Sequence, residues 1–199
     1  MHGTHLFCLL VSVNLVNAGC GHTTGLPPQC VEMLCKVIID KSDGKTDPRN
    51  HMGMSPAHLS SSQECLALLY KYGADMGARD DNGRTPLFVA CAMNRVECAE
   101  FLVNCLDQSE ASLLTMDNRG DTPLHAAACN GSVDCLLLLL QFGVDPMHTN
   151  QKGLKALDLA IRNKQKICKQ LLVEYHIHFN TSSEFDSVLF LATLEVSPS

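Results

Sequence analysis

A repeated unit is clearest in DNRGDTPLHAAACNGSVDCLLLLLQFG, residues 117–143, because two other segments of the chain have the same spacing. Its Thr-Pro-Leu triplet begins at Thr122 and occurs again at Thr85, and the same slots are filled differently from Lys155, 33 residues later. A glycine stands two residues ahead of each triplet slot. Thirteen residues after each slot begins there is a cysteine, namely Cys98, Cys135 and Cys168. The chain therefore contains one structural unit in several copies.

Each copy predicts two short helices. Thr122 can cap the first helix through its hydroxyl, and Pro123 suits the first turn, where its missing N–H costs nothing. Gly131 then ends this helix, and Asn94, which tolerates the left-handed conformation, holds the same slot in another copy. A second, strongly apolar helix is expected over residues 133–142. Because such a pair cannot bury its own apolar surface, neighbouring copies must stack side by side.

A period near 33 residues that carries DxxGxTPLHxAA resembles the ankyrin repeat. Residues 117–135 are close to the family pattern throughout, whereas Phe88 stands in another copy where the family usually has histidine. The copy that begins near Lys155 departs further, because Ala156 and Asp158 replace the proline and the histidine. The resemblance implies an all-α fold, an ankyrin-repeat solenoid of stacked helix-turn-helix units joined by β-hairpin loops. It also implies that the histidines in this slot, His58 and His125, link neighbouring repeats through hydrogen bonds.

We expect an array of about four to five repeats, with the first and last degenerate. Residues 1–29 are interpreted as a degenerate first repeat helix and an enlarged loop. The alternative is a secretory signal peptide, although no Lys or Arg precedes the apolar run. Residues 30–179 are assigned to ankyrin repeats, and 180–199 to a C-terminal helix or a truncated repeat. Because the chain opens inside a repeat and ends abruptly, we expect a fragment or shortened product of a longer protein.

Two copies have irregular lengths. The copy that contains Ser55 and Pro56 lacks three residues where its two helices should turn, so its first helix should be short or distorted. The next copy carries four extra residues between Cys98 and Thr122. Residues 107–117 should therefore form an enlarged loop or an extra helical turn at one edge of the stack.

Composition narrows the class of protein. The chain has 199 residues, of which 46% are apolar, so it could bury a sizeable core in one stacked array. Its net charge of −6 disfavours nucleic acid as the main partner, and no apolar run is long enough to cross a bilayer. The eleven cysteines fall within apolar helical patterns, which indicates reduced core cysteines rather than a disulfide framework. We therefore expect a cytoplasmic protein, with the nucleus as a second compartment.

Motifs that carry chemistry are scarce. The sequence has neither a GxxxxGK[ST] phosphate loop nor a GxSxG nucleophile motif. Four residues could in principle bind a zinc ion, namely Cys20, His22, Cys30 and Cys35. Their spacing is not one of the usual zinc-ligand spacings, and the helix pattern already accounts for Cys30 and Cys35. We predict no catalytic residue, no cofactor and no metal, and hence no enzyme.

Function should then reside on the surface. The resemblance implies that partner proteins bind through the hairpin tips and the exposed side of the first helices. Carried over slot by slot, this partner-binding strip comprises Asp81, Asn82, Arg84, Ala92, Met93, Asn118, Arg119, Asp121, Cys129, Asn130, Gln151, Lys152, Leu154, Arg162 and Asn163. The alternative for any single one of these side chains is that it is merely solvated.

The strip is also graded in charge along the sequence. Its middle is acidic, with Glu97, Glu100, Asp107, Glu110, Asp117 and Asp121. Its later part is basic apart from Asp158, with Lys152, Lys155, Arg162, Lys164, Lys166 and Lys169. Such a dipolar strip would orient a partner and speed its capture. The alternative is that these charges only keep a rather apolar chain in solution.

These observations favour a non-catalytic protein–protein interaction module, a scaffold, adaptor or targeting segment that is monomeric and binds a protein partner of unknown identity. The main alternative is a regulatory ankyrin segment of a larger enzyme whose catalytic domain is absent from this chain. A third reading is a secreted or membrane-tethered adaptor. The identity of the partner is not written in the sequence, because the surfaces of such repeats vary independently of their scaffold.

Overall fold

The computed structural model describes residues 49–106 and 113–181, with side chains as far as 176. Four repeats follow one another in this part of the chain, at 50–79, 80–116, 117–149 and 150–181. Their first helices form an inner row, made of α3 (Pro56–Leu59), α5 (Pro86–Ala92), α8 (Pro123–Asn130) and α10 (Ala156–Arg162). Their second helices form an outer row, made of α4 (Gln63–Lys71), α6 (Val96–Cys105), α9 (Val133–Gln141) and α11 (Lys166–Thr181).

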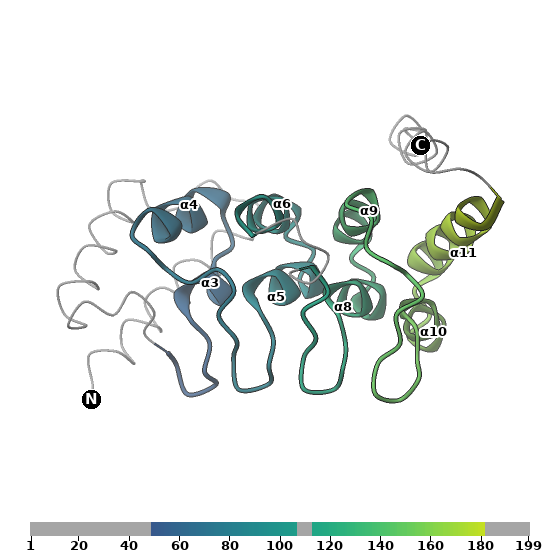
Figure 1. The fold of residues 1–199 in the computed structure, drawn as a ribbon, viewed down its shortest axis with the longest axis horizontal. Coiled ribbons are helices and arrows are strands. Elements are labelled where there is room, and N and C mark those ends of the chain that lie inside the picture. Colours follow the sequence, from purple (N-terminus) through teal and green to yellow (C-terminus); the bar gives the residue numbers. More distant parts are fainter. Residues whose placement is uncertain (1–48, 107–112, 182–199) are drawn as a thin grey trace.

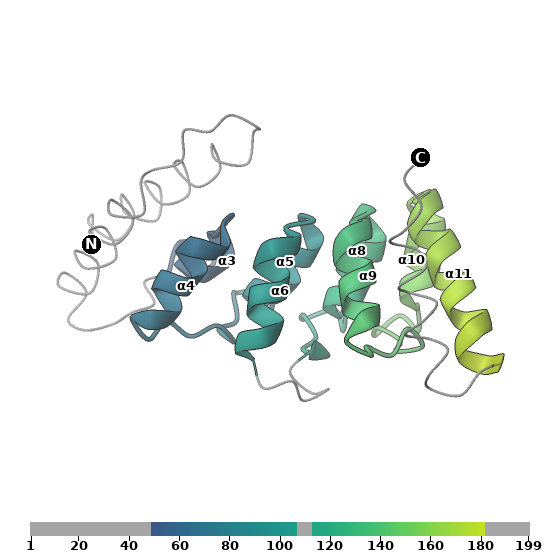
Figure 2. The same ribbon diagram turned by 90° about the horizontal axis from the view of Figure 1, so that it is seen from above.

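The two rows stack side by side along the molecule, and the hairpin loops all project from the same edge (Figure 1). Each outer helix runs beside the inner helix of its own repeat (Figure 2). In the described residues the only β pairing is one isolated antiparallel bridge, between Thr149 and Lys155. The predicted all-α solenoid of stacked helix pairs joined by hairpin loops is therefore confirmed.

The first helices begin and end as the local sequence predicts. Thr85 and Thr122 accept hydrogen bonds from the backbone N–H groups three residues ahead, at 3.3 and 3.4 Å. Gly131 and Asn94 both adopt positive φ, at 78° and 52°, and turn the chain toward the second helix. Lys164 holds this slot in the last described repeat with φ of 60°, so the left-handed turn is kept where neither glycine nor asparagine is present.

The core contains the column of cysteines that the spacing predicts. Cys65, Cys98, Cys135 and Cys168 are all buried. The Cys98 and Cys135 thiols each lie against a carbonyl of the preceding repeat, at 3.9 Å from the Ser60 oxygen and 3.8 Å from the Ala90 oxygen. Apolar side chains of the second helices fill the space around the column, so the core runs continuously from repeat to repeat.

Burial should make these thiols slow to react. Burial raises the pKa of Cys65 and Cys168, and it raises the pKa of Cys98 to about 11. Since the thiolate is the nucleophile, we expect Cys98 to be alkylated at least about 100-fold more slowly at pH 8 than the half-buried Cys129. Peptide mapping by mass spectrometry after timed exposure to N-ethylmaleimide measures each rate. Equal rates at Cys98 and Cys129 in the native protein would contradict the buried column.

The shortened repeat has the short first helix that its length predicts, because α3 has four residues and the other first helices have seven or eight. The C-terminal carbonyls of α3 are covered by the next repeat. Arg95 donates from Nη1 to the carbonyl oxygens of Ser60, at 2.9 Å, and Leu59, at 3.4 Å. Ser132 and Gln165 occupy the same slot and also reach back to the preceding first helix. The residue before each second helix thus secures the repeat before it.

Replacing Arg95 with alanine should lower the free energy of unfolding by about 2 kcal/mol, because a charged donor and two carbonyl contacts are lost together. Ser132→Ala is the matched control, since its hydroxyl makes one contact of 3.4 Å at an intact helix end, and it should cost under about 1 kcal/mol. Urea unfolding followed by circular dichroism measures both. An Arg95→Ala loss no larger than that of Ser132→Ala would show that Arg95 does not secure α3.

The end of the described stack exposes apolar side chains that earlier repeats bury. Ile161 is 50% exposed, whereas Cys91 and Ala128 in the same slot are fully buried. Val173 is 36% exposed, whereas Leu140 in the same slot is buried. The C-terminal helix or truncated repeat predicted for 180–199 would follow this face, but beyond Thr181 it lies outside the described residues. Outside them too are the degenerate repeat predicted for 1–29, the first part of 30–179 and most of the 107–117 loop.

Candidate partner-binding surface

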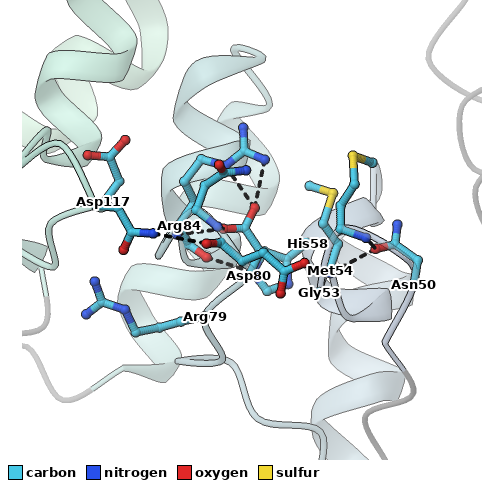
Figure 3. Close-up of polar contacts among 12 residues, drawn as sticks. Asn50, Gly53, Met54, His58, Arg79, Asp80, Arg84 and Asp117 are labelled. Carbon is cyan, nitrogen blue, oxygen red and sulfur yellow. Dashed lines mark hydrogen bonds and ion pairs between the residues drawn. The ribbon is translucent and has the colours of Figure 1, made fainter.

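One polar side chain organises each hairpin. Asn50, Asp80, Asp117 and Asn150 occupy equivalent positions. In each case Oδ1 accepts hydrogen bonds from the backbone N–H groups two and four residues ahead, at 2.8–3.0 Å. Figure 3 shows two of these turns, around Asn50 and Asp80. A glycine with positive φ follows each of the four positions by three residues. The tips are therefore tightly closed turns rather than loose loops.

Neighbouring tips are joined by backbone hydrogen bonds. The N–H groups of Asp81, Asn118 and Gln151 each donate to a carbonyl of the preceding tip, at 3.1, 2.8 and 3.1 Å. The approach is close at the glycines: a Cβ on Gly120 would lie 2.8 Å from the Gln151 nitrogen. The tips thus form one continuous edge in fixed register.

Two buried histidines add a second link between repeats. Nε2 of His58 lies 2.9 Å from the Arg84 carbonyl, and Nε2 of His125 lies 3.0 Å from the Leu154 carbonyl. On the other side of each ring, Nδ1 accepts from a backbone N–H, that of Ser55 or Thr122. The rings are therefore neutral with the proton on Nε2. The predicted histidine links are confirmed at these two junctions. At the junction between the 80–116 and 117–149 repeats, the buried Phe88 occupies the position of the histidine.

Most of the predicted strip residues lie where the sequence places them. Six occupy the hairpin tips with exposed side chains, namely Asp81, Asn82, Asn118, Arg119, Gln151 and Lys152. Six occupy the C-terminal ends of the inner helices or the turns that follow, with exposed or half-buried side chains, namely Ala92, Met93, Cys129, Asn130, Arg162 and Asn163. Leu154 is half-buried on the hairpin arm that leads into α10.

The remaining two strip residues, Asp121 and Arg84, are bound by neighbouring side chains. Asp121 was predicted to be exposed on the strip, and this prediction is wrong because the residue is buried. Its carboxylate accepts from Nδ2 of Asn150 at 2.7 Å and pairs with Nε of Arg119 at 3.5 Å, so only 9% of the residue is exposed. Arg84 is half-buried and pairs with Asp80 at 2.7 Å. Burial alone would raise the pKa of Asp80, but the Arg84 side chain and nearby backbone N–H groups outweigh burial and lower it.

Four of the six acidic residues of the expected charge gradient are not exposed on the strip. Asp117 and Asp121 are buried within the hairpins. Glu97 and Glu100 lie on α6, in the outer row, and the remaining two acidic residues of the gradient lie outside the described residues. The basic residues of the late repeat are mostly exposed. Sequence order misplaced Asp117 and Asp121 because it does not distinguish a buried, hydrogen-bonded carboxylate from a solvated one.

A hollow of about 300 Å³ opens where the 117–149 and 150–181 repeats meet, between α8, α10 and their hairpins. It is lined by Arg119, Asp121, Cys129, Asn150, Lys152, Leu154, Leu159, Arg162 and Asn163. Seven of these nine belong to the predicted strip, which the structure thus brings together from two repeats. Sequence reasoning missed Asn150 and Leu159. Asn150 could have been found, because it occupies the same turn position as Asp117. Nothing in the sequence distinguishes Leu159 from the other buried leucines of the helices.

The described part of the chain contains neither a cluster of metal ligands nor a helix that could span a membrane. Within 49–106 and 113–181, no three His, Cys, Asp or Glu side chains gather as metal ligands would. The four residues weighed as a zinc site lie outside these ranges. In the same ranges no helix combines the length and the apolar character that a bilayer crossing requires.

Comparison with known proteins identifies repeats in the same places. A family model described as ankyrin repeats in many copies matches residues 51–103, and one described as ankyrin repeats in three copies matches 104–183. Together the two models span all four repeats of the described stack.

Three relatives are similar to this chain over part of their own length. The tyrosine-protein kinase HTK16 of Hydra vulgaris is 32% identical over 138 residues, which cover 68% of this chain and 18% of the kinase. The mouse ankyrin repeat and SOCS box protein 5 is 35% identical over 112 residues, 55% of this chain and 32% of that protein. The human SMC5-SMC6 complex localization factor protein 1 is 34% identical over 137 residues, 66% of this chain and 13% of that protein. This chain thus spans a third or less of each relative.

Proposed function

The chain belongs to the ankyrin-repeat family, and from this we propose that it is a non-catalytic protein–protein interaction module, a scaffold, adaptor or targeting segment. It binds its protein partner through the hairpin tips and the inner-helix surface. The observation that carries this proposal is the continuous edge of tips, each joined to the next by a backbone hydrogen bond. A surface fixed in this way loses little freedom on binding, so its contacts convert efficiently into affinity.

The test compares two triple variants of equal charge. The strip variant combines Asn82→Arg, Met93→Arg and Gln151→Arg, at exposed positions of the 80–116 and 150–181 repeats. The control variant combines Gln63→Arg, Asn104→Arg and Gln170→Arg, at exposed positions of the outer helices. Each protein is immobilised, exposed to cell extract, and the bound proteins are quantified by mass spectrometry.

Specific partners should fall by about tenfold or more with the strip variant and stay near the wild-type level with the control variant, because large charged groups then occupy only the strip. Circular dichroism establishes that both variants remain folded. If the two variants retain the same partners to the same extent, or lose them equally, the strip is not the binding surface.

A second candidate is a regulatory segment of a larger enzyme. The observation that favours it is the match to the Hydra kinase, of which the matched residues are only 18%. An antibody raised against the repeats should then detect an endogenous protein well above the 21.7 kDa of this chain, and its immunoprecipitate should carry an enzymatic activity. Detection of a 21.7 kDa product alone would remove this candidate and leave the free-standing adaptor.

We also propose that the protein is a monomer in the cytoplasm or the nucleus, with no role in binding nucleic acid. The thiol state supports this placement, since all seven described cysteines are free and five of them are buried, as expected in a reducing compartment. Light scattering should return the mass of one chain. Cell fractionation, together with an intact amino-terminal Met1 or His2 on the isolated protein, distinguishes this placement from secretion.

A further inference from the structure

We propose that the hollow between α8 and α10 receives an acidic peptide segment of the partner, in which carboxylates flank an aliphatic side chain. The inference rests on the proposed function and names the chemistry of its ligand. It assigns Lys152 and Arg162 as the cations that hold the carboxylates, and Leu154 with Leu159 as the apolar surface that holds the aliphatic group.

The positive charge of the hollow indicates that its ligand is negatively charged. Its lining contains three cations, Arg119, Lys152 and Arg162, and one carboxylate, Asp121, a formal balance of +2 in a chain whose net charge is −6. Asp121 is already bound by Asn150 and Arg119. Across the described part of the chain, the side chains of Lys152 and Arg162 make no ion pair or hydrogen bond. Two uncompensated cations therefore face a partly enclosed space, where attraction for a carboxylate exceeds that on an open surface.

The size and lining of the hollow indicate which uncharged group of the ligand binds beside the carboxylates. About 300 Å³ is at the lower end for ligand pockets, which suits one or two side chains of a peptide rather than a whole cofactor. Leu159 is buried and Leu154 is half-buried on its wall, so an aliphatic side chain would lose its water there without leaving a polar group unsatisfied. The Asn163 amide already donates to the Cys129 sulfur at 3.1 Å. The polar groups still available are chiefly the cations.

A peptide fits these features better than a nucleic acid. Binding of single strands combines an extended basic groove with aromatic side chains on which bases stack. The lining of this hollow contains no aromatic residue, and the hairpin turns beside it contain the carboxylates of Asp117 and Asp121. A row of phosphates would meet these carboxylates, whereas a short acidic segment needs only the two exposed cations.

Fluorescence anisotropy with synthetic peptides tests the proposal on the full chain. The probe is a fluorescein-labelled decapeptide with the central sequence Asp-Glu-Leu-Glu-Asp. Its comparison peptides carry Lys-Arg-Leu-Arg-Lys, or serine in place of the leucine. The protein variant is Lys152→Glu with Arg162→Glu, and the matched control is Lys166→Glu with Lys169→Glu, two exposed lysines of α11 that do not line the hollow.

The acidic peptide should bind wild type, and the double reversal at the hollow should weaken it by about tenfold or more, while the α11 control changes it less than about threefold. Replacement of the leucine should also weaken binding, and the basic peptide should not bind. Equal losses in both variants, or none in either, would overturn the proposal. So would a labelled oligodeoxythymidine that binds as tightly and depends on the same two cations, because the ligand would then be a polyanion.

Failure here is distinguishable from failure of the proposed function. If proteins captured from extract depend on the three strip positions outside the hollow but not on Lys152 and Arg162, the module binds partners and only the acidic-segment inference falls. If capture is indifferent to the strip positions, the proposed function itself falls, whatever the peptides show.

Discussion

Replacing Gly120 with alanine should lower the free energy of unfolding by about 2–4 kcal/mol, because two effects combine. Gly120 has φ of 78°, a left-handed conformation that costs an L-residue about 1 kcal/mol or more. The added Cβ would also lie 2.8 Å from the backbone nitrogen of Gln151, in the neighbouring tip. A backbone atom that donates a hydrogen bond to the Arg119 carbonyl cannot yield as a flexible side chain would. The junction between the two repeats must therefore open.

Gly153→Ala separates these two effects. Gly153 holds the same turn position with φ of 71°, but in the described structure a Cβ added to it would have no neighbouring atom within 4 Å. This variant should lose only the conformational part, about 1 kcal/mol. Urea unfolding of both variants, followed by circular dichroism, gives the difference. Equal losses at the two glycines would mean that the close approach of neighbouring tips contributes nothing to stability.

Acidification should destabilise the protein through its two buried histidines. Burial lowers the pKa of both His58 and His125, and the ring hydrogen bonds to backbone carbonyls, together with the nearby carboxylates, only partly oppose this effect. The folded state therefore binds fewer protons than the unfolded state at pH values below the unfolded pKa, near 6.5. Stability should be complete above that pH and fall as the pH decreases toward the folded pKa. The slope should approach at most about 1.4 kcal/mol per pH unit for each histidine.

The measurement is the free energy of unfolding of wild type and of the double variant His58→Gln with His125→Gln, at intervals from pH 7.5 to 5.0. Glutamine can still donate to the Arg84 and Leu154 carbonyls but does not titrate. The variant should be less stable at pH 7.5 and nearly flat through this window, so the difference between the curves shrinks on acidification. Parallel curves would show that the histidine links are not sites of acid sensitivity.

The features that could be predicted from the sequence are those set within one repeat. Thr122, Pro123 and Gly131 fix where a helix begins and ends through contacts of three or four residues, and such rules can be read from spacing. The cysteine column followed from the same spacing, because equivalent positions of a stacked array form rows. The short helix α3 followed from a count of missing residues.

The features that could not be predicted arise between repeats. Asp121 is buried because Asn150, 29 residues later, reaches across to its carboxylate. The carbonyl oxygens of Ser60 and Leu59 at the end of α3 accept hydrogen bonds from Arg95, 35 and 36 residues later. In each case the partner lies one repeat away, and the consensus pattern does not specify it. The hollow also forms between two repeats. Seven of its lining residues were predicted as strip positions, but the sequence did not indicate that they enclose one space.

Because that hollow is shared by two adjacent repeats, an occupant would be coupled to the integrity of the last described repeat. Whenever the 150–181 repeat frays from the stack, six of the nine lining residues leave with it, and the ligand must dissociate. By thermodynamic linkage, a ligand at 100 times its dissociation constant would oppose that fraying by about 2.7 kcal/mol. Slower hydrogen exchange confined to the C-terminal amides, with the α3–α6 end unchanged, would then report occupancy of the hollow.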